Sequence, residues 1–209
     1  MAESGAQDWT DLARNQAGKG VNAEAEAARR ANPVRNVVAR VLGVHTDAAA
    51  WTKGGKGEQL VGKRLAKLGP AWKVIHSIPV GVKGTDIDHL VIGPGGVFSL
   101  SAKNHRGKRV WVNTDVVKVN GQSQKYIRIS EHEAQRASRS LSAACGFQIA
   151  VTGVVVIVAD SLTFAGTPTR ARVVGRTDIA HWLRRQPVVI DEPTVESIFA
   201  MARRSTTWA

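Results

Sequence analysis

Three acids and one lysine follow one another in an order that suits phosphodiester chemistry. Glu58 comes first, Asp86 and Asp88 lie together further along, and Lys103 follows them. Carboxylate oxygens bind Mg²⁺ or Mn²⁺, and a metal held in this way polarises a phosphate and acidifies a water. A lysine offsets the charge of the pentavalent transition state. These residues predict a metal-dependent phosphodiesterase site, and the alternative is a structural ion pair between Asp86 and Lys103.

Glu58 is expected on the inward face of a helix. Residues 57–68 predict this helix because apolar residues recur at helical spacing and Gly69-Pro70 ends it. Glu58 shares the apolar face with Val61, Leu65 and Leu68. An acid there is costly unless it has a cation, a metal or a hydrogen-bond partner. The alternative is an ordinary first-turn glutamate that the helix dipole stabilises.

A hairpin is expected to gather the other site residues. Extended segments 86–92 and 97–103 flank a Gly93-Pro94-Gly95-Gly96 turn. A register symmetric about the Pro94–Gly95 bond places Asp88 opposite Ser101 and Asp86 opposite Lys103, all on one face. His89 then points away from Asp88, as a core histidine. The opposite face carries an apolar set: Ile87, Val91, Phe98, Leu100 and Ala102.

The remaining elements alternate between strands and helices. Strands are predicted over residues 72–79, 110–112, 116–119, 151–158 and 172–174, and the continuous apolar character of 151–158 indicates burial on both faces. A helix over residues 130–145 is expected to begin with Ser130 as N-cap and Glu133 completing a capping box. Helices over residues 178–185 and 192–203 follow.

The length of 209 residues and a hydrophobic content of 43% predict one domain with a sizeable core. Residues 1–21 are expected to be a flexible N-terminus. Residues 22–50 are expected to form a helical extension, interrupted at Asn32-Pro33, whose apolar stripe docks on the core. Residues 51–160 form the core, and 161–209 complete the domain with a strand and helices.

The net charge of +12 makes nucleic acid, and DNA in particular, the leading partner. A solvated basic surface is the alternative. Candidate phosphate-binding residues follow the lysine or lie near the 130–145 helix: His105, Arg106, Lys108, Arg128, Arg136 and Arg139. Four tryptophans could stack bases or belong to the core: Trp51, Trp72, Trp111 and Trp182.

Several other function classes are disfavoured. The lone Cys145 can form no intramolecular disulfide, and no Cys/His set has zinc-finger spacing. Residues 57–64 resemble a Walker A motif, but Arg64 stands where Ser or Thr is required, so an ATP site is rejected. The sequence shows no secretory signal and no membrane span, which predicts a cytoplasmic protein with no membrane partner.

The ordered motifs resemble the nuclease-related domain, often called NERD, of the PD-(D/E)xK nuclease superfamily. The resemblance covers roughly residues 51–160 and rests on three pieces: Gly57-Glu58, the run from Ile87-Asp88 through Gly93-Pro94-Gly95-Gly96 to Phe98, and Lys103-Asn104-His105-Arg106-Gly107. It implies an α/β fold with a restriction-endonuclease-like mixed central sheet flanked by helices. It also implies a Mg²⁺ or Mn²⁺ cofactor and a possible homodimer. The implied site roles are Glu58 as helix acid, Asp88 as metal-binding aspartate, Lys103 as catalytic lysine and Gln135 as orienting glutamine.

Ser101 departs from that pattern, because the superfamily has an acid two residues before the lysine. A neutral hydroxyl is a poor substitute for a charged Mg²⁺ ligand. Asp86 from the same face, or Glu131 or Glu133 from the following helix, could compensate. Two functions remain open: a metal-dependent DNA phosphodiesterase of endo- or exonuclease type, and a catalytically weakened nuclease-like module that binds DNA or another partner.

Overall fold

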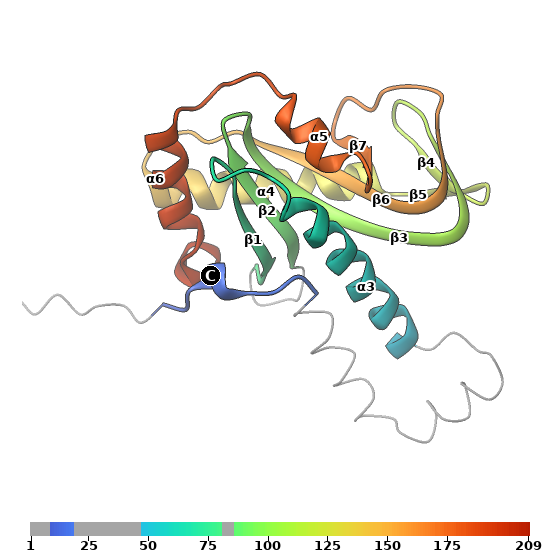
Figure 1. Cartoon of the computed structure of the whole chain (residues 1–209), viewed down its shortest axis with the longest axis horizontal. Coiled ribbons are helices and arrows are strands. Elements are labelled where there is room, and N and C mark those ends of the chain that lie inside the picture. The colour runs from blue at the N-terminus through green and yellow to red at the C-terminus, as the bar shows by residue number, and fades with distance from the viewer. Residues whose placement is uncertain (1–8, 19–46, 81–85) are drawn as a thin grey trace, which may run out of the picture.

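A seven-stranded mixed sheet with helices on both faces forms the centre of the computed structural model, which describes residues 9–18, 47–80 and 86–209. In Figure 1, α3 (Asp47–Leu65) crosses in front of the sheet and α4 (Tyr126–Cys145) lies behind it. The predicted α/β class, consistent with a restriction-endonuclease-like domain, is confirmed. The expected helical extension lies outside the described residues, apart from 47–50, which begin α3.

The first three strands are antiparallel, and the second and third separate before the first residues of the second strand are reached. They are β1 (Lys73–Ile78), β2 (Ile87–Gly93) and β3 (Gly96–Val112). The β2–β3 hairpin has the predicted register, from Gly93 opposite Gly96 to His89 opposite Leu100. The ladder ends there, so the expected pairing of Asp88 with Ser101 and of Asp86 with Lys103 is wrong.

β3 is one long strand where the sequence predicted two. Residues 110–112 were expected to be an independent strand, but they continue β3 beyond a register shift between His105 and Arg109. β6 (Val151–Phe164) runs parallel to β3 along both halves. β4 (Val117–Val119) pairs with the second half of β3, and β5 (Gln122–Gln124) pairs with β4. β7 (Arg172–Gly175) adds parallel to β6 at the other edge.

Apolar clusters pack both faces of the sheet. One joins Val61 and Leu65 of α3 to the strands and to α5 (Ile179–Arg184), and another joins α4 and α6 (Glu192–Ala202) to the opposite face. The predicted apolar set lies in the α3 cluster, except Ile87, which belongs to the α4 cluster. The β1–β2 ladder is interrupted beside Ile87, where Ser77 has a φ of 48°, and regular alternation is lost there.

The start of α4 differs from the expected one. The helix begins at Tyr126, and Lys125 is its N-cap residue with no side-chain cap bond, so Ser130 is not the cap and no capping box forms. Ser130 is buried inside the helix, where Gly153 of β6 lies against it. Tertiary packing overrides the capping-box pattern, because Ile127 is buried in the core and the helix therefore begins before Ser130.

Residues 9–18, which belong to the segment expected to be flexible, pack as an N-terminal strap. Leu12 of η1 (Leu12–Arg14) is buried, and the Asp11 carboxylate accepts a hydrogen bond from Arg203 Nε at 2.9 Å. Figure 1 shows the strap in blue beside α6 and the chain end, where η2 (Ser205–Trp208) lies. At its other end Ala17 lies so close to α3 that a Cβ on Gly62 would be 2.8 Å from it.

The structure also bears on two exclusions made from the sequence. Residues 57–64 lie within α3, which confirms that they form no phosphate-binding loop. Among the described helices, none has the length and apolar character needed to cross a membrane.

Gly153 is expected to be intolerant of a side chain. A Cβ there would lie 2.6 Å from the backbone oxygen of Ser130, and that helical backbone cannot move aside cheaply. Gly153→Ala should therefore reduce the free energy of unfolding by about 1–3 kcal/mol, measured by urea denaturation. Gly69→Ala is the control, because its Cβ would meet nothing within 4 Å. Equal stability of the two variants would contradict close packing of α4 on β6.

Candidate active site

Asp88 lies where β2 and β3 separate. Its Oδ2 accepts a hydrogen bond from the backbone N–H of Ala102 at 2.7 Å, beyond the last ladder pair. A buried backbone N–H needs an acceptor, and the carboxylate provides one where the neighbouring strand no longer does. The bond places Asp88 beside Lys103. Burial raises the pKa of Asp88, and the charge of Lys103 partly opposes this effect.

Glu58 approaches Asp88 from α3. Glu58 is only 5% exposed. Because α3 begins at Asp47, Glu58 lies well inside the helix and is not a first-turn glutamate. Gly57 allows the close approach, since a Cβ there would lie 2.9 Å from Asn104 Cβ on β3. Burial, followed by the charge of Asp88, raises the pKa of Glu58 to about 8, while the Gly18 backbone N–H and Lys103 act in the opposite direction.

Lys103 and Asp86 complete the group of residues singled out by spacing. The charge of Lys103 lowers the pKa of both Glu58 and Asp88, so the lysine lies within electrostatic reach of both acids. Asp86 is half-buried, which raises its own pKa, and its charge raises those of Glu58 and Asp88. Between these two described side chains, Asp86 and Lys103, no ion pair forms.

Glu133 reaches the same place from α4. Burial raises its pKa to about 7, Lys103 lowers it and the charge of Asp88 raises it. In the sequence, Glu133 matches the capping-box pattern three residues after Ser130. A better signal was available, because Ser130, Ala137 and Leu141 are buried at helical spacing on this side of α4 and Glu133 is close to their stripe.

Ser101 lies on the sheet face that α4 covers. Its neighbours Leu100 and Ala102 belong to the α3 cluster, so alternation directs Ser101 to the other side. The residue is 4% exposed. Glu133 approaches from the helix on this face, and the position that lacks an acid on β3 is therefore near an acid supplied by α4.

A buried and a half-buried histidine, His89 and His76, lie behind these acids. His89 Nδ1 lies 2.8 Å from His76 Nδ1, with the rings edge to face at 4.9 Å. Burial, followed by the charge of His76, lowers the pKa of His89 to about 3, and the backbone of Glu58 has the opposite effect. The core position predicted for His89 is confirmed. This neutral pair joins β1 to β2 behind the acids.

Gln135 is not brought to the acid cluster. It is exposed and lines a separate depression with Glu131, Gly153 and Arg170, on another side of α4 from Glu133. Glu131 Oε2 lies 4.0 Å from Arg170 Nη1. Of the two glutamates of α4, Glu133 is the one whose pKa responds to Lys103 and Asp88, while Glu131 pairs with Arg170.

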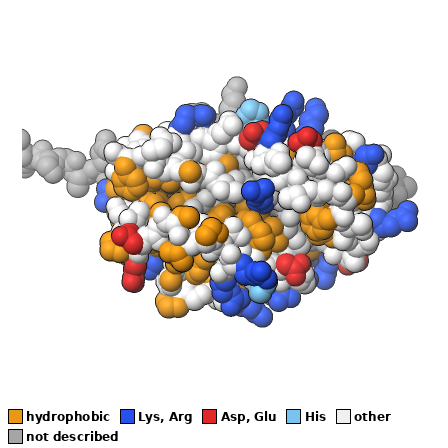
Figure 2. Space-filling model, turned by 90° about the horizontal axis from the view of Figure 1, so that it is seen from above, with side chains coloured by type: hydrophobic (Ala, Val, Ile, Leu, Met, Phe, Trp, Pro, Cys, Tyr) orange, Lys and Arg blue, Asp and Glu red, His pale blue; other side chains and the backbone are white. Residues whose placement is uncertain are grey.

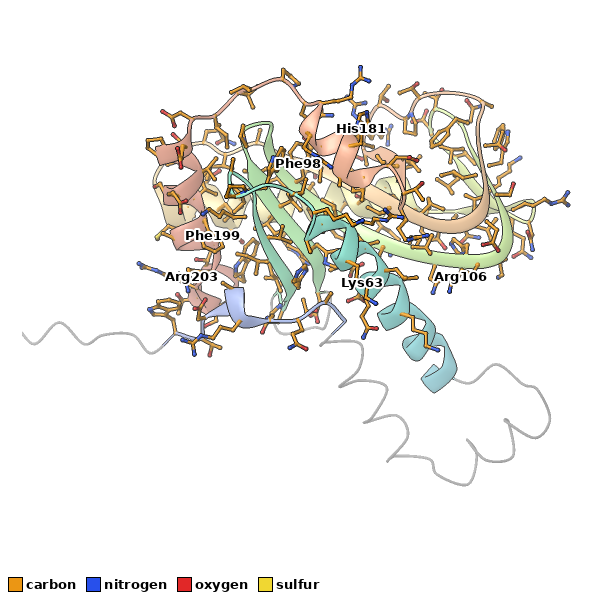
Figure 3. All side chains as sticks on the ribbon, viewed as in Figure 1. Lys63, Phe98, Arg106, His181, Phe199 and Arg203 are labelled. Carbon is orange, nitrogen blue, oxygen red and sulfur yellow. The ribbon has the colours of Figure 1, made fainter. Side chains whose placement is uncertain are left out.

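The candidate phosphate-binding residues fall at different distances from the acids. Arg136 is half-buried and its charge lowers the pKa of Glu133. His105 Nε2 lies 3.0 Å from the Tyr126 hydroxyl, where β3 meets the start of α4. Arg106 and Lys108 are exposed on β3 beyond the site, and Arg106 extends from the strand in Figure 3. Arg128 and Arg139 are exposed on α4. Basic side chains are spread widely over the face shown in Figure 2.

The acids fit a divalent cation whose remaining ligands come from water and from the substrate phosphate. Within the described part of the chain, no three His, Cys, Asp or Glu side chains are grouped tightly enough to hold a metal by themselves. Glu58 and Asp88 nevertheless provide carboxylate oxygens whose repulsion a cation would relieve. Mg²⁺ keeps several waters and is commonly bound by one or two carboxylates together with substrate phosphates. The donor set fits this open kind of site.

A mixed sheet covered on both faces, with buried acids and a lysine where two strands separate, defines a nuclease-related α/β domain. The sequence profile of the family described as "Nuclease-related domain" matches residues 53–158, half of the chain. The chain belongs to this family, and the matched range agrees with the predicted core.

A curated relative adds little to this assignment. An uncharacterized protein of Bacillus anthracis is 42% identical over 59 residues, which cover 26% of this chain and 28% of that protein. The chain therefore spans less than a third of the relative's length. No solved structure matches the chain significantly.

The raised pKa of Glu58 predicts a stability that decreases with pH. Between about 4.5 and about 8, the folded protein keeps a proton on Glu58 that the unfolded chain has lost, so the free energy of unfolding falls as pH rises. Without divalent metal, Glu58→Gln should remove part of this fall and stabilise the protein by on the order of a few kcal/mol above pH ~8. Urea denaturation across pH measures the effect.

Glu192→Gln serves as the control, because Glu192 is exposed in the first turn of α6. It should leave the pH dependence unchanged. The Glu58 variant should retain the part of the fall that Glu133 contributes up to pH about 7. Identical profiles for the Glu58 variant and the unmutated chain would contradict the burial of a charged acid at this position.

Proposed function

We propose that this protein is a cytoplasmic, divalent-metal-dependent DNA phosphodiesterase whose active site lies where β2 and β3 separate. The observation that carries the proposal is the burial of Glu58 beside Asp88, next to Lys103. A buried carboxylate beside a half-buried one destabilises a fold that has too little positive charge to offset them. Their presence at one place indicates a function that needs them. The single cysteine fits a reducing compartment.

Each residue has a distinct role in this proposal. Mg²⁺ or Mn²⁺, when bound, supplies Lewis acidity and an acidified water. Glu58 holds the metal from α3 and Asp88 holds it from β2, while the Ala102 N–H keeps the Asp88 carboxylate oriented. Lys103 places its positive charge beside the phosphate and stabilises the negative charge that develops there.

Glu133 supplies the carboxylate that position 101 lacks. Its pKa responds to both Lys103 and Asp88, so it is electrostatically coupled to the same pair that an acid at position 101 would adjoin. Ser101 is small and lies on the face of β3 that α4 covers. A serine leaves space for the helix glutamate where a second acid would repel it.

DNA is the proposed substrate because the surface around the site is basic. The net charge of +12 favours a polyanion. Arg136 of α4 acts electrostatically on Glu133, and the exposed Arg106 and Lys108 lie further along the strand that carries Lys103. One such site cuts one strand, so cutting both strands of a duplex requires two, as in a homodimer. Light scattering with and without duplex DNA tests that arrangement.

A weakened nuclease-like module is the second candidate function. The observation that favours it is Ser101, together with the lack of a group of three metal-binding side chains among the described residues. In that case the basic surface would bind DNA or another partner without cutting it.

Removal of Lys103 or Asp88 separates these functions. Cleavage of labelled single- and double-stranded DNA with Mg²⁺ or Mn²⁺ should fall by about 100-fold or more in Lys103→Ala and in Asp88→Asn, because each removes transition-state or metal stabilisation. Binding of the same DNA in EDTA should change little. Gels measure cleavage, and fluorescence anisotropy measures binding.

Lys67→Gln is the matched control for charge, because Lys67 is exposed beyond the far end of α3. It should cut like the unmutated chain. Salt-sensitive binding without any cutting in the unmutated chain would favour the binding module, and the absence of both would refute a nucleic-acid function.

The role of Glu133 predicts a rescue. Glu133→Gln should reduce metal-dependent cleavage by about tenfold or more, since it removes one carboxylate from the site. Ser101→Asp combined with Glu133→Gln should recover activity, because it restores an acid on the strand. Glu131→Gln, a neighbour on α4 that pairs with Arg170, should have no effect on cleavage. A double variant as inactive as Glu133→Gln alone would refute the exchange of positions.

A further inference from the structure

A basic groove with a partly exposed tryptophan lies further along β3. It encloses about 400 Å³ between the second half of β3, β4, the turn after β4, and the end of β6. Arginine, lysine and hydroxyl or amide groups line it without any acid: Arg109, Trp111, Lys118, Asn120, Ser161 and Thr163. The lining thus combines positive charge, hydrogen-bonding groups and one aromatic ring.

Trp111 is placed as a surface for stacking. Its neighbours Val110 and Val112 are buried, so alternation turns Trp111 to the opposite face of the sheet, where it stays partly exposed. Lys118, its cross-strand partner, holds Nζ 5.3 Å from the ring centroid. By contrast, Trp72 and Trp182 pack against the buried Phe98. The side chain of Trp51 lies outside the described residues.

Hydrogen bonds hold the walls of the groove together. Asn120 and Gly121 form a two-residue turn between β4 and β5, with φ of 48° and 86°. The Asn120 N–H donates to the Arg109 carbonyl at 2.9 Å, and the Arg109 N–H donates to Asn120 Oδ1 at 2.9 Å. The turn is thereby fastened to β3, and a ligand would enter a preformed groove.

The groove continues the path of the active site. Lys103 and Arg109 lie on the same strand, and at a rise of about 3.3 Å per residue their separation along β3 is at most ~20 Å. The exposed Arg106 and Lys108 lie between them. Val110 and Val112 pack with Ile127 of α4, so Trp111 lies on the face of the sheet from which α3 brings Glu58. A nucleic-acid strand that passes Glu58 on that face would reach the groove along β3.

We propose that the groove binds a single-stranded segment of nucleic acid next to the cleavage position. Trp111 stacks on one base, and Arg109 and Lys118 contact the phosphates beside it. Aromatic stacking on a basic track is the usual means of binding single strands without sequence preference. The proposal rests on the proposed nuclease function for its substrate path, but binding in the groove requires no catalysis.

The test is binding of a labelled oligothymidylate, with a duplex for comparison, by fluorescence anisotropy in EDTA, where no metal-dependent cleavage occurs. Trp111→Leu should weaken single-strand binding roughly tenfold, and Trp111→Phe should retain most of it because a ring remains. Lys118→Gln should reduce the slope of log affinity against log salt by about one. Lys67→Gln, with the same change of charge at a distant site, should bind like the unmutated chain.

The outcomes separate this proposal from the nuclease function. Unchanged binding in both Trp111→Leu and Lys118→Gln, equal weakening in Trp111→Leu and Trp111→Phe, or no binding by the unmutated chain at low salt would each overturn the groove. Lys103→Ala should keep full oligothymidylate binding. A chain that never cuts DNA but shows the expected Trp111 and Lys118 effects would lose the nuclease proposal and keep the groove.

Discussion

The hydrogen bond from the Ala102 N–H to the Asp88 carboxylate is the interaction on which the site depends. β2 and β3 pair only as far as His89 and Leu100, and beyond that point a side chain replaces a strand as the acceptor. Because the strands separate there, the space beside Asp88 is open to both faces of the sheet. A helix on either side can therefore deliver an acid to it, Glu58 from α3 and Glu133 from α4.

The same arrangement opposes stability. Burial and mutual repulsion raise the pKa of Glu58, Asp88 and Glu133, so without metal the folded protein holds protons that the unfolded chain has lost, and its stability falls as pH rises. The apolar clusters on both faces of the sheet offset this cost. The neutral His76–His89 pair adds a fixed support behind Glu58. A rigid framework around a strained polar centre is what an active site requires.

Much of the fold and part of the site could be predicted from local pattern. The turn around Pro94 set the hairpin register, and the apolar run after Val151 indicated a strand buried on both faces, which the structure confirms. The failures have tertiary causes. Ser130 matched a capping pattern but lies buried against Gly153, and Ile87 changes face beside the interruption at Ser77. The place of Glu133 beside the apolar stripe of α4 could be seen in the sequence, but the end of the β2–β3 ladder, which opens the site to that helix, could not.

The N-terminal strap links the candidate site to both ends of the described chain. Asp11 bonds Arg203, and the Gly18 N–H acts on Glu58, although the family match covers only residues 53–158. The two anchors of the strap are made at very different times during translation. Until residue 203 has left the ribosome, Asp11 lacks its arginine and the strap is held at one end only. The second anchor of the strap is therefore made only after the elements that carry Asp88, Lys103 and Glu133 have all been synthesised.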